Sequence, residues 1–210
     1  MRTTRFAPAR QEREGYDPGI AELVVFHHAQ GVTPGVLSFA EDLRTAGHVV
    51  HVPDLYDGAV FADLSDGVRH AEQLGFGTVL ERGRVAAEAL PSEIVYAGFS
   101  LGVLPAQMLA QTRQGAKGAL LFHSAVPASE FGGSWPPDVP LQIHMMDADP
   151  FALEGDLDAA KELDATVEDA ELFLYHGDRH LFADNSTADF DPAAATLVNQ
   201  RVSSFLDRLG

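Results

Sequence analysis

The segment VYAGFSLGVLPAQ, residues 95–107, places a serine between two glycines where a strand gives way to a helix. An apolar run leads into Gly98, and apolar residues at helical spacing follow Gly102. A G-x-S-x-G turn of this kind holds its serine in a strained backbone conformation and exposes the hydroxyl above the sheet. Because the turn brings backbone segments close together, positions 98 and 102 favour residues without side chains. The segment predicts that Ser100 is a nucleophile.

The backbone after Ser100 suggests a second part of the same chemistry. The amide of Leu101 opens the new helix, and amides at a helix N-terminus stabilise negative charge that develops in front of them. We therefore expect the Leu101 amide to be one donor of an oxyanion hole. The alternative is a glycine-rich turn in which Ser100 only caps the following helix.

Short apolar runs alternate with helical patterns on both sides of this segment. The expected strands cover residues 22–28, 48–56, 93–99, 118–124, 140–146 and 170–176. The expected helices cover residues 35–47, 65–90 with a break near Gly75 and Gly77, 101–112, 156–164 and 193–209. Continuous apolar strands are typical of a parallel sheet that helices cover on both faces. The pattern predicts an α/β fold in three layers, with a mostly parallel sheet of about six strands.

Composition limits the partners and the location of the protein. The chain has 210 residues, no cysteine and a formal net charge of −17. The absence of cysteine excludes disulfides and thiolate metal sites and is typical of a reducing, cytoplasmic location. The negative charge disfavours nucleic acid and anionic membranes as partners. Residues 1–20 are polar and lack the apolar core of a secretory signal, so we expect a tail or edge segment there and a single domain over residues 21–210.

A nucleophilic serine needs a histidine base and an acid that orients the base. When this turn lies in a sheet of this kind, the acid and then the histidine follow later strands. Asp147 and Asp149 both follow the strand at 140–146, and both are candidates for the acid. His180 lies in a loop after the last strand and is favoured as the base over His176, which lies at the end of that strand. Two further histidines lie within expected strands and are expected to be satisfied core or rim residues: His123 and His144.

Together these segments resemble the dienelactone hydrolase family of α/β-hydrolases over residues 22–209. VVFHHAQGVTPGVLSFAEDLRTAGHVVHVPDLYDG resembles the first strand, oxyanion loop and following helix of the family, and GFSLG matches its nucleophile turn. HMMDADPF matches the acid strand, where an aspartate precedes a short turn and an aromatic residue. YHGDRHLFAD resembles the histidine loop, where an aromatic residue, here Phe182, follows the histidine by two positions. The resemblance implies the α/β-hydrolase fold and selects Asp149 over Asp147 as the acid.

The resemblance also implies a second oxyanion donor in the loop after the first strand, which corresponds to the amide of Ala29, with His28 beside it. The best-known members of the family use a cysteine nucleophile, a glutamate in this loop and arginines that hold a substrate carboxylate. Here Ser100 stands in place of the cysteine and His28 in place of the glutamate, and Arg179 is the arginine near the expected pocket. The two replacements fit each other, because a hydroxyl is activated by a histidine base and a neighbouring glutamate would only add charge.

These expectations describe a serine hydrolase that cleaves a small carboxylic ester or lactone through an acyl-enzyme, without a cofactor or metal. Ser100 attacks the carbonyl carbon, His180 takes the proton and Asp149 orients His180. The expected pocket wall has five members: His28, Phe99, Phe131, Trp135 and Phe151. Aromatic side chains suit a small apolar or aromatic acyl group. The alternative for Phe131 and Trp135 is that they only hold their own loop against the body of the protein.

Two other functions compete with this prediction. A metal-dependent hydrolase would take its ligands from His27, His28, His176, Asp178 and His180. Adjacent residues of a strand point to opposite faces, however, which separates His27 from His28. A non-catalytic homologue would use the fold for ligand binding alone. The intact set of candidate catalytic residues weighs against that second alternative.

Overall fold

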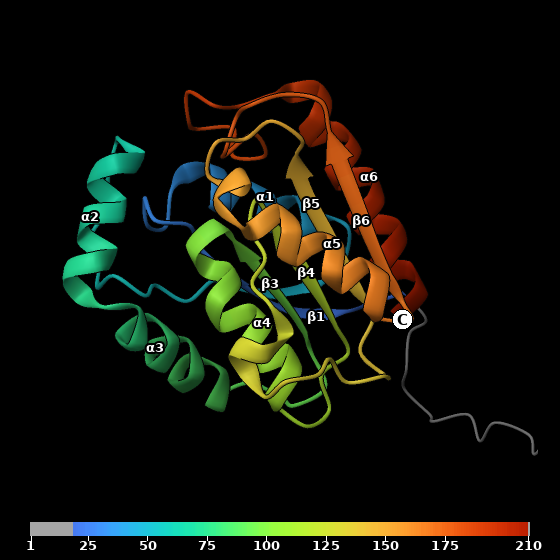
Figure 1. Ribbon diagram of the computed structural model, residues 1–210. Helices are drawn as coiled ribbons and strands as arrows, with labels where there is room; N and C mark the ends of the chain where they lie inside the picture. Colours follow the sequence, from blue (N-terminus) through green and yellow to red (C-terminus); the bar gives the residue numbers. More distant parts are fainter. Residues whose placement is uncertain (1–18, 210) are drawn as a thin grey trace, which may run out of the picture.

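The computed structural model describes residues 19–209, in which a parallel sheet forms the central layer (Figure 1). Its strands are β1 (Glu22–Phe26), β2 (Val49–His51), β3 (Val95–Phe99), β4 (Gly118–Phe122), β5 (Leu141–Met146) and β6 (Ala170–Tyr175). Their order across the sheet is β2-β1-β3-β4-β5-β6, and each neighbouring pair is parallel. The predicted α/β fold with a six-strand sheet is confirmed. Most of the expected N-terminal tail, residues 1–18, lies outside the described residues.

Helices connect the strands and cover both faces of the sheet. They are α1 (Pro34–Thr45), α2 (Leu64–Leu74), α3 (Phe76–Glu88), α4 (Val103–Thr112), α5 (Asp156–Thr166) and α6 (Pro192–Leu209). Short 3-10 helices are η1 (Ser100–Gly102), η2 (Ala128–Phe131) and η3 (Ala152–Glu154). The break expected within residues 65–90 falls at Gly75, whose φ of 86° lies in the left-handed region that favours glycine. Gly77 lies inside α3.

Two apolar cores lie on the two faces of the sheet. On β3, Tyr96 packs in a core with α3, α4 and α5, whereas Val95, Ala97 and Phe99 pack in a core with α1 and α6. This division follows from the strand geometry, because successive side chains of a strand point to opposite faces. In Figure 1, α3, α4 and α5 lie in front of the sheet and α6 lies behind it.

The strand β2 is shorter than the sequence suggests. The strand expected at 48–56 is limited to Val49–His51 and pairs with β1 over three residues. Pro53 has no N–H to donate to a sheet ladder, which ends the pairing there. The chain then approaches the end of β1, where the amide of Leu55 donates to Nε2 of His27 (3.0 Å).

The topology gathers four loops at one end of the sheet. They follow β1, β3, β5 and β6, and because all strands are parallel their carboxyl ends lie together. These loops contain the residues that the sequence singled out for chemistry. Among the helices of residues 19–209, none is long and apolar enough to cross a membrane.

Candidate active site

Ser100 lies directly after β3 with a backbone φ of 48°. Left-handed backbone is costly for a residue with a side chain, and such strain concentrates at functional sites. The turn leaves no space for side chains at its two glycines. A Cβ on Gly98 would lie 2.1 Å from the carbonyl oxygen of Gly102, and a Cβ on Gly102 would lie 2.3 Å from that of Phe26. The two glycines thus allow the tight turn that presents Ser100, with Gly102 packed against the end of β1.

Replacing Gly102 by alanine is expected to destabilise the fold, because the new Cβ would meet the backbone of β1 rather than a movable side chain. We expect the free energy of unfolding to fall by at least about 2 kcal/mol. Gly77→Ala is the matched control, since no atom lies within 4 Å of its Cβ position in α3. That variant should gain about 0.5–1 kcal/mol. Urea unfolding measures both values, and equal stabilities would contradict the close approach at Gly102.

Ser100, His180 and Asp149 form a continuous hydrogen-bonded chain. The Ser100 hydroxyl lies 2.7 Å from Nε2 of His180, and Nδ1 of His180 lies 2.6 Å from Oδ2 of Asp149. Asp149 Oδ1 accepts a further bond from the amide of Phe151 (3.0 Å). Asp149 and His180 are buried, whereas Ser100 is half-buried. In this arrangement the hydroxyl donates to Nε2, and the carboxylate accepts the Nδ1 proton and fixes the tautomer of the imidazole.

Asp147 and His176, the competing candidates, form a separate exposed pair. Nδ1 of His176 lies 3.2 Å from Oδ2 of Asp147, and the His176 side chain is 99% exposed. The amide of Gly177 and the His176 side chain both lower the pKa of the Asp147 carboxyl. Among the described hydrogen bonds, none joins this pair to Ser100.

The two amides expected as oxyanion donors both lie next to the serine turn. Leu101 follows Ser100 in η1. Ala29 lies in the loop after β1, and the turn contacts that loop because a Cβ on Gly102 would lie 2.7 Å from the carbonyl oxygen of His27. Within residues 19–209, neither the Leu101 amide nor the Ala29 amide donates to a protein acceptor. Both amides are thus unused within the described residues, as donors of an oxyanion hole would be.

His28, expected beside the Ala29 amide, is fully buried and paired with Asp184. Oδ2 of Asp184 accepts from His28 Nε2 (2.7 Å) and from the Thr33 hydroxyl (2.5 Å). Oδ1 accepts from the amide and the hydroxyl of Ser186 (2.8 and 2.6 Å). Burial raises the pKa of Asp184, but the hydrogen bonds from His28, Ser186 and Thr33 outweigh burial and hold the pKa at about 2. The sequence analysis missed the role of Asp184, although it is the last residue of the segment HLFAD that begins at His180.

Asp184 makes the stability of the fold depend on pH in acid. Its pKa of about 2 in the folded protein lies below the value of about 4 for an aspartate in an unfolded chain. The stabilisation is therefore complete above about pH 5 and is lost as the pH falls toward 2. We expect the stability difference between the natural sequence and Asp184→Asn to shrink by about 1 kcal/mol between pH 5 and pH 3. Urea unfolding at the two pH values measures this change, and a constant difference would contradict it.

The two histidines expected as satisfied core residues differ from each other. His144 has a tyrosine hydroxyl and a glutamine oxygen as partners for its ring nitrogens. His123 is buried after β4 with a φ of 71°, and in the described part of the chain neither of its ring nitrogens has a partner. The expectation is therefore wrong for His123, whose ring lies 4.7 Å from that of Phe182 and 5.9 Å from that of His180, between centroids. Burial and the nearby His180 keep the pKa of His123 well below its usual value, so the ring beside the candidate base is uncharged.

Two of the five residues expected in a pocket wall are buried instead. Phe99 is 1% exposed and stacks on Phe122, with ring centroids 4.5 Å apart, in the core beneath α1 and α6. The expectation for Phe99 is wrong because the alternation along β3 turns its side chain to that core. His28 is also fully buried and engaged with Asp184, so its side chain offers no surface to a substrate.

The other three expected pocket residues are at least partly exposed. Nε1 of Trp135 donates to the carbonyl of Val139 (2.6 Å), and the ring packs against the core, so Trp135 holds its own loop. Phe131 is half-buried at the end of η2. Phe151 is 46% exposed, and its ring centroid lies 4.6 Å from that of His180. Phe151 is therefore the expected wall residue that the structure places directly beside the candidate base.

The residues considered as metal ligands are engaged separately. Nδ1 of His27 donates to the carbonyl of its neighbour His28 (2.8 Å), while its Nε2 accepts from Leu55. Burial lowers the pKa of His27 to about 4, so its ring is neutral. His176 and His180 pair with different aspartates. Over residues 19–209, no group of three or more histidine, cysteine or acidic side chains is placed to hold a metal ion.

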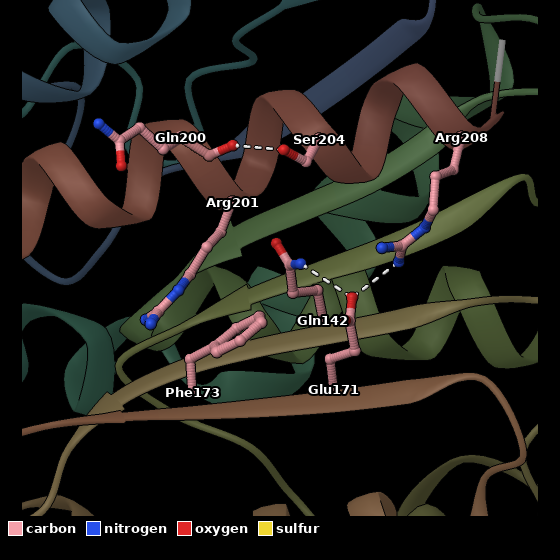
Figure 2. A pocket seen from close by; sticks show the side chains of 7 residues that line it. All are labelled: Gln142, Glu171, Phe173, Gln200, Arg201, Ser204 and Arg208. Atoms are coloured by element: carbon pink, nitrogen blue, oxygen red, sulfur yellow. Dashed lines mark hydrogen bonds and ion pairs between the residues drawn. The ribbon is translucent and has the colours of Figure 1, made fainter.

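A shallow groove lies away from the candidate site, between α6 and the amino-terminal halves of β5 and β6 (Figure 2). Arg201 lies over the ring of Phe173, with its guanidinium carbon 4.1 Å from the ring centroid. Glu171 accepts from Gln142 (3.2 Å) and Arg208 (2.7 Å). These contacts join α6 to the outer strand of the sheet, at the end opposite to Ser100.

The strand order, the serine turn after β3 and the histidine loop after β6 define the α/β-hydrolase class. Within that class the sequence can be placed further. The chain belongs to the dienelactone hydrolase family, whose family model matches residues 11–210. The predicted family is therefore confirmed. A search of curated proteins finds no significant match.

Solved structures support the same fold at low sequence identity. A dienelactone hydrolase-like promiscuous phosphotriesterase from metagenomic libraries has a TM-score of 0.71 and 19% identity, over 93% of this chain and 89% of that chain. A dienelactone hydrolase from Anabaena variabilis has a TM-score of 0.63 and 20% identity, over 89% and 85%. A thermophilic esterase from Thermogutta terrifontis, with butyrate bound, has a TM-score of 0.56 and 20% identity, over 95% and 88%. Identities of this size show the fold alone.

Proposed function

We propose that this member of the family is a serine hydrolase that cleaves carboxylic esters or lactones through an acyl-enzyme, with Ser100, His180 and Asp149 as its catalytic triad. The observation that carries the proposal is the chain of hydrogen bonds from Ser100 to His180 to Asp149, 2.7 and 2.6 Å long. A nucleophile within hydrogen-bond reach of a base, and a base oriented by an acid, is the arrangement that nucleophilic catalysis requires.

Each residue has one role in the proposed reaction. His180 takes the hydroxyl proton through Nε2 while the Ser100 oxygen attacks the carbonyl carbon, and Asp149 stabilises the imidazolium that forms. The amides of Leu101 and Ala29 hold the oxyanion of the tetrahedral intermediate. His180 returns the proton to the leaving alcohol, and water then attacks the acyl-enzyme with the same base. The left-handed backbone at Ser100 keeps the hydroxyl in position for both steps.

The exposed apolar side chains beside His180 favour substrates with small apolar acyl groups. Phe151 and Leu153 are 46% and 61% exposed in the loop after β5, and Phe151 contacts His180. Arg179 donates to the carbonyl of Phe190 (2.7 Å), which engages it within its own loop rather than with a substrate carboxylate. Because Arg179 is engaged in this way, a neutral ester or lactone suits the site better than a lactone that carries carboxylates. A cytoplasmic location belongs to the same proposal and is supported by the absence of cysteine.

A substrate panel tests the proposed function. We expect turnover of p-nitrophenyl acetate and butyrate, slower turnover of octanoate, and turnover of a neutral aryl lactone. One structural neighbour is described as a promiscuous phosphotriesterase, so a phosphotriester belongs in the same panel. A fluorophosphonate should label Ser100, which peptide mass spectrometry locates. A folded protein that hydrolyses nothing in the panel and takes up no label would overturn the proposal in favour of the non-catalytic homologue.

A further inference from the structure

A buried network joins the loop after β1 to the segment that begins at His180. His28 in the first loop and Asp184 in the second are paired at 2.7 Å, and both side chains are at most 1% exposed. Asp184 also accepts from Thr33, the N-cap of α1, and from Ser186. Both of its oxygens are thus occupied, and His28 and Thr33 are the donors that connect it to the loop of Ala29.

The hydrogen bonds around His28 fix its tautomer. The amide of Gln30 donates to Nδ1 of His28 (3.2 Å), so that nitrogen carries no proton. The proton lies on Nε2 and is donated to Asp184. His28 therefore holds the backbone of its own loop on one side and the histidine segment on the other.

The same loop has its peptide planes fixed. The carbonyl oxygen of His28 accepts from Nδ1 of His27 (2.8 Å) and from the amide of Gly31 (3.0 Å). In a trans peptide the C=O and N–H point in opposite directions, so these two bonds also set the direction of the Ala29 amide. The amides of Gln30 and Gly31 are thereby used within the loop, and the Ala29 amide is left for a ligand.

The histidine segment is short and has its own turn. The amide of Asp184 donates to the carbonyl of Leu181 (3.0 Å), and the amide of Leu181 donates to Asp189 (3.3 Å). His180 lies four residues before Asp184. Asp184 thus shares a short, turn-closed segment with the base, and His28 is the direct neighbour of the oxyanion donor Ala29.

Resting on the proposed function, we propose that His28 and Asp184 are positioning residues, which keep the Ala29 amide and the His180 imidazole in register around the Ser100 hydroxyl. Neither residue touches the reacting atoms. A base and an oxyanion donor must act on the same tetrahedral centre, and a misplacement of about 1 Å costs about 10²-fold in rate. The link between the two loops is the hydrogen bond from His28 Nε2 to the Asp184 carboxylate.

The test compares five variants with p-nitrophenyl acetate as substrate: three in the buried network, a control histidine and Ser100→Ala. We expect His28→Leu to lower kcat by about 10- to 10²-fold with KM changed by less than about threefold, because the lost interaction acts on the transition state. Asp184→Asn, which keeps the shape of the side chain, should lower kcat by about tenfold. His28→Gln should recover most of the rate, since its amide N–H can reach Asp184. Fluorophosphonate labelling of Ser100 should slow in parallel with kcat.

His48→Leu is the matched control for a buried histidine. Nδ1 of His48 accepts from the amide of Ala21 (3.1 Å) at the amino end of the sheet, away from the loops of the site. It should lower Tm and leave kcat unchanged. If Ser100→Ala stays active, the proposed function fails and this inference with it. If Ser100→Ala is inactive while His28→Leu and Asp184→Asn keep the natural kcat, the function stands and the positioning role is overturned. The same holds if His28→Gln is as slow as His28→Leu.

Discussion

Ser100→Ala is expected to reduce ester hydrolysis by about 10⁴-fold or more, the largest effect of any single change in this protein. The loss has a direct physical reason. The hydroxyl oxygen forms the covalent bond to the acyl group, and no other hydroxyl among the described residues donates to Nε2 of His180. The oxyanion amides remain in the variant, so a small residual rate above the uncatalysed reaction should persist. Initial rates with p-nitrophenyl acetate and burst kinetics measure the effect.

The variant has to be shown to fold. Alanine and serine both carry a Cβ, so the left-handed backbone at position 100 is about equally strained with either residue. The Tm should therefore change little. Ser204→Ala is the matched control, because its hydroxyl only donates to the carbonyl of Gln200 within α6 (3.0 Å). Full activity in Ser100→Ala, or fluorophosphonate label at a different residue, would refute the assignment of the nucleophile.

Local sequence patterns predict most of the fold and the position of the serine turn. β3 is a continuous apolar run that is buried along its whole length, and its ending at a G-x-S-x-G turn is visible in the sequence. Gly98 and Gly102 are required by contacts within the turn and with the adjacent strand, so short-range spacing contains that information. The choice of Asp149 over Asp147 depended on family resemblance, because both follow the same strand within three residues.

What the sequence could not show depends on contacts between distant loops. Asp184 pairs with His28, which lies 156 residues earlier in the sequence, and no local pattern indicates that partner. Phe99 was expected in the pocket wall, but its place next to Ser100 in the sequence does not give the direction of its side chain, which packs in the core with α1 and α6. His123 was expected to be satisfied because most buried histidines are, and its left-handed backbone is a tertiary feature.

Asp149→Asn is expected to lower kcat by about 10⁴-fold at neutral pH. Asp149 accepts the Nδ1 proton of His180 at 2.6 Å, which leaves Nε2 free to accept the Ser100 proton. An asparagine amide can donate to Nδ1 instead, which favours the tautomer with the proton on Nε2 and removes the acceptor that the hydroxyl needs. The buried carboxylate also stabilises the imidazolium during the reaction, and the neutral amide does not.

Asp147→Asn is the control that separates the orientation of His180 by Asp149 from the general effect of removing one negative charge. It removes the same charge two residues away, from a carboxylate that pairs with the exposed His176, and we expect kcat to stay within about twofold of the natural value. The pair of variants therefore compares the same substitution at a buried oriented carboxylate and at an exposed one. Steady-state rates between pH 6 and pH 9, on variants whose Tm shows them folded, decide between the two aspartates. If Asp147→Asn is the one that loses activity, the acid is Asp147, and the hydrogen bond between Asp149 and His180 is structural.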